Sequence, residues 1–469
     1  MRNKHMIVLI SMVVATGGLL FGFDTGVISG VIPFLQTDWK IDNNDIEWIT
    51  AAGLLGAMLG AIGCGRMSDV FGRKKMILVS AVIFTAGALW SGLACNLISL
   101  ILSRLFLGVA IGVASFTVPL YIAEIAPAKS RGKLVSMFQL MVTIGILFSY
   151  ISDTIWADEN KLDCWRMMLF VGVVPALILL IGMFFMPETP RWLMSKGNLK
   201  ECRKVLLKIE AADDVDRLLQ QMEKEIRMDQ DTKVGWKYLL QPWLRTPLMI
   251  AISIMFFQQF VGINTVIYYS PKIFLMAGFE STLSAIWASV GVGVINVIFT
   301  ILSLYLVDNI GRRKLYFTGL SGIAVSVFCL SICFIYANQL GEVGQWLMVG
   351  LMLAYIAFFA ISIGPLGWLV ISEIFPQKVR GLGTSIGSLS VWVFNCIVSF
   401  TFFKIVEAFS ISGTDIVVGQ TISENPAGAF FLYGFIALLA LIWGYFFLPE
   451  TKGLSLEEIE KMWKKGKKI

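Results

Sequence analysis

Long apolar runs are the feature that most limits how this chain can fold. Of its 469 residues, 57% are apolar and only 15% are charged, whereas a soluble domain is nearer one half apolar and one quarter charged. A membrane span needs about 20 mostly apolar residues. Twelve such spans are predicted, with approximate bounds at 6–36, 47–66, 75–94, 97–120, 134–156, 166–186, 246–276, 282–307, 314–337, 344–372, 382–409 and 427–448.

The positions of the basic residues predict how the spans are oriented. Of the 38 Lys and Arg residues, five fall on one side, Arg104 lies inside a span, and the other 32 fall on the opposite side. Because Lys and Arg are enriched in cytoplasmic loops, that side and both chain ends are predicted to be cytoplasmic. The basic tail is expected to face anionic lipid rather than nucleic acid.

Three short patterns occur twice in the same order, which predicts a repeated architecture. The chain is therefore predicted to be an all-α membrane protein with two pseudo-symmetric six-helix bundles. The predicted parts are a bundle over 1–190, a linker of short cytoplasmic helices over 191–245, a bundle over 246–449 and a basic tail over 450–469. The paired patterns are Gly65–Lys74 with Leu304–Arg313, Glu124–Gly132 with Glu373–Gly381, and Pro187–Thr189 with Pro449–Thr451.

Small residues recur at a spacing of four in two spans. Gly56 and Gly60 share one helix face, and so do Gly108 and Gly112. Because small residues at this spacing let helices approach closely in lipid, we expect these faces to form tight helix contacts.

Two ionisable residues stand out inside the predicted spans. Asp24 lies in the first span and Arg104 in the fourth. Because a charge at mid-membrane is costly, such residues are rare and mark function. We expect the two side chains to pair. The pair is either a static contact that fixes packing or a proton switch, in which movement of Arg104 changes the proton affinity of Asp24; the residues alone leave both open.

Polar side chains gather in the seventh span, where Gln258, Gln259 and Asn264 flank Gly262. Unwound backbone at membrane depth is tolerated only beside protein or a cavity. Hydrogen bonds between helices explain any one of these residues, but the group favours a cavity for a neutral polyhydroxylated ligand. A second break is predicted at Gly364-Pro365 in span ten. Other residues predicted to line the cavity are Gln139, Tyr268, Asn296, Gly364, Trp368, Trp392 and Asn395.

Several motifs, in a fixed order along the whole chain, resemble those of the sugar porter branch of the major facilitator superfamily. The resemblance is to bacterial xylose, galactose and arabinose symporters and, more distantly, to animal glucose facilitators. The motifs that carry it are Gly65–Lys74, Asp308-x-x-Gly311-Arg312-Arg313, Pro187–Leu193, Gln258-Gln259-x-x-Gly262-x-Asn264-x-x-x-Tyr268-Tyr269 and Pro449–Gly453.

This resemblance implies alternating access with a sugar bound between the two halves. It implies sugar contacts at the polar and aromatic residues named above and a proton site at Asp24 with Arg104 as partner. Val391 departs from the family pattern, in which a Gln precedes Trp392, so one sugar contact is missing or moved to Asn395. The resemblance also implies a cytoplasmic gate of ion pairs formed by Asp69, Arg73, Glu124, Arg131, Glu188, Asp308, Arg312, Glu373, Arg380 and Glu450.

The sequence therefore predicts an importer of a pentose or hexose together with a proton in a bacterial inner membrane. Its expected partners are a monosaccharide, a proton and the lipid bilayer, and it is expected to work as a monomer. A sugar uniporter with a structural Asp24 remains an alternative, as does a transporter-like sugar sensor, against which the short tail argues. No nucleophile, base or metal-ligand set indicates an enzyme, and no metal or cofactor is expected.

Overall fold

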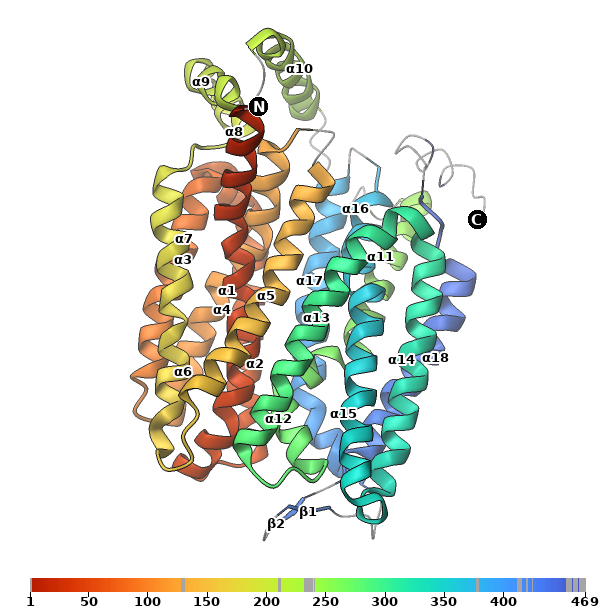
Figure 1. Cartoon of the computed structure of the whole chain (residues 1–469). Coiled ribbons are helices and arrows are strands. Elements are labelled where there is room, and N and C mark those ends of the chain that lie inside the picture. Colours follow the sequence, from red (N-terminus) through yellow and green to blue (C-terminus); the bar gives the residue numbers. More distant parts are fainter. Residues whose placement is uncertain are drawn as a thin grey trace. The chain divides into compact units, whose positions relative to one another are not determined.

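The computed structural model describes residues 2–127, 131–209, 212–231, 239, 241–376, 379–410, 416–418, 421–423, 425–452, 458 and 463. In this part of the chain, twelve helical stretches are long and apolar enough to cross a membrane. This result confirms the number of spans predicted from the sequence. Figure 1 shows the helices in chain order.

The first part of the chain holds six spans and the helices of the linker. These elements are α1 (Arg2–Trp39), α2 (Asn43–Phe71), α3 (Arg73–Gly92), α4 (Leu97–Ile125), α5 (Arg131–Trp156), η1 (Leu162–Cys164), α6 (Trp165–Val171), α7 (Val173–Phe185), α8 (Pro190–Ser195), α9 (Leu199–Ile209) and α10 (Ala212–Asp231).

The second part holds the other six spans and a short ribbon. Its elements are α11 (Pro242–Phe260), α12 (Ile263–Met276), α13 (Thr282–Ile310), α14 (Arg312–Ile335), α15 (Ala337–Ile361), α16 (Ile363–Glu373), α17 (Arg380–Ala408), β1 (Ile416–Val418), β2 (Thr421–Ser423) and α18 (Ala427–Phe447). The antiparallel β1–β2 ribbon lies between α17 and α18, and the fold is otherwise helical where it is described.

Two spans of the second part are broken, and each break has a local cause. Gly262 separates α11 from α12 with a φ of 89°, a left-handed conformation that glycine adopts without strain. The break in span ten lies at Ser362, two residues before the predicted Gly364-Pro365. Proline lacks an N–H and is tolerated in the first turn of a helix. Pro365 therefore lies in the first turn of α16, and the break in the span falls before it.

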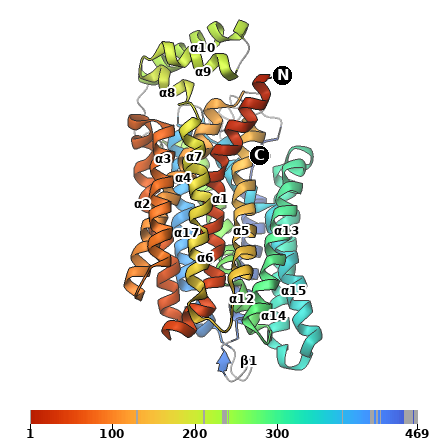
Figure 2. The same cartoon turned by 60° about the vertical axis from the view of Figure 1, so that its left-hand side comes forward.

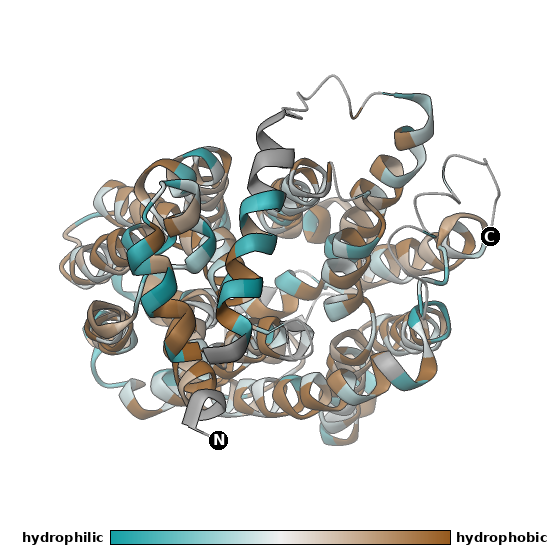
Figure 3. Ribbon diagram, turned by 90° about the horizontal axis from the view of Figure 1, so that it is seen from above, coloured by the Kyte–Doolittle hydropathy of each residue, from teal (hydrophilic) through white to brown (hydrophobic). Residues whose placement is uncertain are grey.

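The chain forms two compact units, which do not follow the two halves of the sequence. Unit 1 comprises residues 1–24, 52–145 and 169–235, and unit 2 comprises 25–51, 146–168 and 236–469. In unit 1, α9 and α10 lie beyond the ends of α3, α4 and α7, on the side where the chain begins (Figures 1 and 2). Both helices carry broad hydrophilic faces, in contrast to the mainly hydrophobic spans (Figure 3).

Close backbone contact joins α2 and α4 in unit 1, as the glycine spacing predicts. A Cβ atom on Gly56 would lie 2.9 Å from Cα of Gly108, and a Cβ atom on Gly112 would lie 2.9 Å from the backbone of Ala57. Both distances are shorter than ordinary carbon contacts. Only residues without a side chain allow this approach, and it brings α2 close to the part of α4 that carries Arg104.

One end of unit 2, which carries β1 and β2, holds segments from both halves of the sequence; we call it the ribbon end. Here Glu47, at the start of α2, is only 1% exposed. It accepts a hydrogen bond from the backbone N–H of Phe403 at 3.0 Å and lies 3.2 Å from Nζ of Lys404. On α5, the Tyr150 hydroxyl donates to the Ile267 carbonyl at 2.9 Å. The first-half helices are thus fastened to α12 and α17.

Candidate functional site

The predicted Asp24–Arg104 pair is present in unit 1. Asp24 of α1 and Arg104 of α4 are 5% and 2% exposed, and Nη1 of Arg104 donates a hydrogen bond to Oδ1 of Asp24. Gly53 of α2 leaves room for the guanidinium, since a Cβ atom there would lie 3.4 Å from Nη2. Nε of Arg104 is buried with no hydrogen-bond partner in the described part of the chain. The pair is therefore shielded from solvent, and one donor of the guanidinium is left without a hydrogen bond to a described residue.

A chain of amides in unit 2 connects the two broken spans. Asn264 donates to Oε1 of Gln259 at 2.5 Å, and Gln259 donates to Oε1 of Gln258 at 3.0 Å. Gln258 then donates to the carbonyls of Ile363 and Gly364, at 3.1 and 2.7 Å, just beyond the break at Ser362. Gln258 therefore forms a hydrogen bond between helices, which is the alternative to ligand binding that the sequence leaves open. Its Nε2 atom is engaged by the protein.

The other predicted lining residues lie on helices that pack around this amide chain or in the other unit. In unit 2, Nδ2 of Asn395 lies 3.3 Å from the Tyr268 hydroxyl, to which it donates, and Trp392 is buried one turn before it on α17. Asn296 of α13 is 6% exposed. Trp368 of α16 is half-buried. Gln139, on α5, belongs to unit 1.

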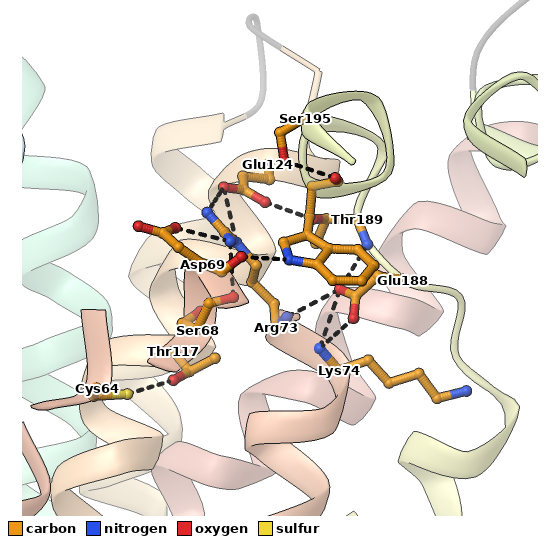
Figure 4. A network of polar contacts seen from close by, with 11 residues as sticks. Cys64, Ser68, Asp69, Arg73, Lys74, Thr117, Glu124, Glu188, Thr189 and Ser195 are labelled. Carbon is orange, nitrogen blue, oxygen red and sulfur yellow. Dashed lines mark hydrogen bonds and ion pairs between the residues drawn. The ribbon is translucent and has the colours of Figure 1, made fainter. Parts of the chain in front are cut away.

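Arg73 is the centre of a polar network at the linker end of unit 1 (Figure 4). Its guanidinium donates to Oε1 of Glu124 at 3.0 Å and to the Ser68 carbonyl at 3.0 Å. The backbone N–H of Arg73 donates to Glu188 at 3.1 Å, as does that of Lys74. Glu188 thus caps the start of α3, where unpaired N–H groups favour an anion. The Thr189 hydroxyl donates to Oε2 of Glu124 at 2.5 Å. We call this set the first rim network.

Unit 2 contains a second rim network with the same connections. Arg312 donates to Oε1 of Glu373 at 2.8 Å and to the Val307 carbonyl at 3.4 Å. Glu450 accepts from the backbone N–H groups of Arg312 and Arg313, at 3.0 Å each, and so caps α14. The Thr451 hydroxyl donates to Oε2 of Glu373 at 2.5 Å. The repeated sequence patterns have produced the same contacts twice.

Among the remaining predicted gate residues, Asp69 contributes less than the glutamates. Asp69 lies 3.0 Å from Nη1 of Arg73 but is 71% exposed. The side chains of Arg131, Asp308 and Arg380 lie outside the described part of the structure. Sequence reasoning assigned no role to Thr189 and Thr451, although both stand in the repeated Pro-Glu-Thr pattern, and that recurrence is the signal that identifies them.

Twelve spans, a doubled rim network and buried polar residues beside two helix breaks indicate a membrane transport protein. Residues 10–463 match the family model described as sugar (and other) transporter. The chain belongs to this family.

Curated relatives and solved structures resemble the chain over almost its full length. It is 36% identical to the galactose-proton symporter of Escherichia coli K12, covering 100% of this chain and 96% of that protein. It is 39% identical to a D-xylose transporter of Levilactobacillus brevis, covering 95% and 93%. The structure of the proton:xylose symporter XylE bound to 6-bromo-6-deoxy-D-glucose matches with a TM-score of 0.80 and 33% identity, covering 98% and 100%. Fold and family agree with the resemblance seen in the sequence.

Proposed function

We propose that this protein imports a neutral monosaccharide together with a proton by alternating access. The observation that carries the proposal is the buried ion pair of Asp24 and Arg104. Replacing a buried ion pair with apolar residues is often neutral or stabilising, so packing alone is a weak reason to keep this one. Relatives named as galactose-, arabinose- and xylose-proton symporters support the same coupling.

In this mechanism Arg104 controls the proton on Asp24. With the hydrogen bond formed, the guanidinium favours the ionised carboxylate. When Arg104 moves away, the buried carboxylate loses its partner and takes up a proton, because an unpaired charge is costly in that surrounding. The unpartnered Nε of Arg104 offers the donor for an alternative contact. Proton uptake and helix movement are thereby linked.

The sugar is proposed to bind the amide and aromatic side chains of the second half, with Gln139 contributing from the first. Amides offer both donors and acceptors, and aromatic faces cover the apolar side of a sugar ring. None of the proposed contact residues is charged, so the group suits a neutral ligand better than a charged one. The proposed contacts are Gln139, Gln258, Gln259, Asn264, Tyr268, Asn296, Gly364, Trp368, Trp392 and Asn395.

The remaining assignments follow from this function. The bundles are proposed to span 1–190 and 246–449 in a bacterial inner membrane, joined by a cytoplasmic linker over 191–245 and followed by a cytoplasmic tail over 450–469. Both chain ends are proposed to lie in the cytoplasm. The rim networks are proposed to belong to the cytoplasmic gate. The protein is proposed to work as a monomer without a cofactor.

The test is sugar-dependent proton uptake into proteoliposomes that hold a pH dye and a weak buffer. Adding xylose, galactose, glucose or arabinose outside should acidify the lumen, with only the true substrates giving a signal that labelled-sugar uptake matches. Uptake of a labelled sugar without any proton movement would leave the uniporter as the function. Failure of every neutral monosaccharide to enter would contradict the proposal itself.

A further inference from the structure

A second carboxyl group lies buried inside a span, and neither Asp24 nor the sugar site accounts for it. Asp153 of α5 is 0% exposed, and neither of its oxygens has a hydrogen-bond partner among the described residues. Asp24, in contrast, is bonded to Arg104. An aspartate buried this completely without a donor calls for a physical explanation.

The Asp153 side chain lies directly against Gly30 of α1. A Cβ atom on Gly30 would come within 2.5 Å of Cγ and 2.6 Å of Cβ of Asp153, so the carboxyl fits only because residue 30 is glycine. One turn earlier, Gly26 packs in the same way against Ser149 and Ile146. The α1–α5 contact thus holds the carboxyl in a tight, dry position at the ribbon end of unit 2.

The groups around Asp153 supply no compensating charge. From α1, the backbone N–H of Gly30 is the one donor directed at the carboxyl and partly offsets its burial, although it does not reach hydrogen-bond geometry with either oxygen in the described part of the chain. From α5, the titratable neighbour is Tyr150, whose hydroxyl already donates to the Ile267 carbonyl of α12. No charged side chain of α1, α12 or α13 pairs with Asp153 in the described part of the chain. Because an isolated buried carboxylate is so costly that such a group takes up a proton instead, these surroundings favour the protonated form of Asp153.

Its burial depends on contacts that an opening of the ribbon end would break. Tyr150 and Leu147 precede Asp153 on α5. The Tyr150 hydroxyl donates to the Ile267 carbonyl of α12. Both side chains also pack against Gly293 of α13, where a Cβ atom would lie 3.1 Å from the Tyr150 ring and 3.0 Å from Leu147. Separation of α12 and α13 from α5 would bring water close to the carboxyl.

We propose that Asp153 is a second proton-binding site, protonated while the ribbon ends of α1, α5, α12 and α13 are packed together and ionised when they part. Proton exchange then occurs with the solvent on the ribbon side in both directions, so this proton is not carried across the membrane. The site goes beyond the proposed coupling at Asp24. It makes closure of the ribbon end sensitive to the pH on that side.

The sign and size of this effect follow from linkage. The closed state holds one proton more than the open state, so acid favours closure and alkali favours opening. Above the ordinary pKa of an aspartate, about 3.9, one extra proton changes the ratio of closed to open molecules about tenfold for each pH unit. The dependence should vanish when residue 153 cannot ionise.

Infrared spectroscopy of the full-length protein in lipid tests the protonation state. The wild type should show a protonated-carboxyl band that shifts in heavy water. Asp153→Asn, which keeps the side-chain shape, should remove it. Asp24→Asn and Glu47→Gln, which alter the other buried carboxyls, should leave it in place. Absence of the band from the wild type, or its loss in D24N instead of D153N, would overturn the proposal.

A distance measurement tests the link to closure and does not rely on any transport assay. Spin labels at the exposed positions Thr37 and Glu407, in a background without the native cysteines, report the separation of α1 and α17 at the ribbon end. The ratio of short to long distances should change about tenfold per pH unit in the wild type and in D24N, and stay flat in D153N. An equal slope in D153N contradicts the proposal. If sugar-proton coupling is absent, the slope remains, so the two proposals fail separately.

Discussion

The two halves of the repeat make the same contacts in their rim networks but differ in the polar residues of their membrane interiors. At the rim, Arg73 and Arg312 each hold a glutamate of a later span and a carbonyl near the end of the preceding helix. Glu188 and Glu450 each cap the helix that begins at the arginine. Inside the membrane the buried ion pair belongs to the first half and the amide chain to the second.

This difference shows which parts of the repeat were free to specialise. A rim network fixes helix ends, a task that both halves share, and so the same atoms recur. In the proposed mechanism the interior residues act on a proton or a ligand, and one copy of each suffices. Coupling between proton and sugar must then link two different sets of residues. The two rim networks, in contrast, are built from the same types of contact.

The largest expected effect comes from removing the group that only the first half possesses. Asp24→Asn keeps the side-chain shape but cannot ionise, so uphill accumulation of sugar should fall to the equilibrium ratio of about one while exchange of labelled sugar across the membrane continues. Accumulation and counterflow in proteoliposomes measure the two activities separately.

Asp216→Asn is the matched control for this substitution, because the Asp216 side chain, on α10, is 67% exposed and belongs to none of the proposed sites. It should retain concentrative uptake. If D24N also accumulates sugar as the wild type does, the interiors do not differ in the way proposed.

The next effect tests whether the rim networks are energetically equivalent. Glu124→Gln and Glu373→Gln each remove the charge facing a buried arginine and should destabilise the protein by roughly 2–4 kcal/mol, seen as lower thermal midpoints in detergent. Because the side chains of Glu124 and Glu373 are 5% and 21% exposed, we expect the larger loss for E124Q. A loss confined to one copy would show that matching contacts do not have matching energies.

The smallest effect concerns the two threonines that complete the networks. Thr189→Val and Thr451→Val preserve side-chain shape and remove one hydrogen bond to Glu124 or Glu373. Each change should cost about 1 kcal/mol, because the glutamate keeps its arginine partner. Thermal midpoints of the single and double variants should show additive losses, since each threonine serves a different unit; strong non-additivity would mean that the networks are coupled.

Much of this architecture could be predicted because it depends on patterns that are local in sequence. Hydropathy gives the twelve spans, and the repeated motifs identify most residues of the rim networks. Glycine spacing predicts that the glycine faces of α2 and α4 pack tightly, and the structure adds that they pack against each other. Gly262 predicts the first helix break, since glycine adopts the backbone conformation that the break requires.

What escaped prediction depends on three-dimensional surroundings. The break at Ser362 precedes the proline because a proline alters the turn before it. The engagement of Gln258 with the Ile363 and Gly364 carbonyls joins segments that are distant in sequence. Asp153 was not singled out, because an aspartate near the end of a predicted span is usually solvated; only the contact with Gly30 shows that it is buried.

The capping of α3 and α14 also has a consequence for how the protein is made. Arg73 meets Glu188, 115 residues later, and Arg312 meets Glu450, 138 residues later. The guanidinium groups can pair with Glu124 and Glu373 earlier, but the N–H groups at the start of α3 and α14 meet their capping glutamates only after the six spans of each half have been synthesised. Each cap therefore forms late in the synthesis of its half, and a chain cut at Pro449 would lack both Glu450 and Thr451 and so would leave the start of α14 uncapped.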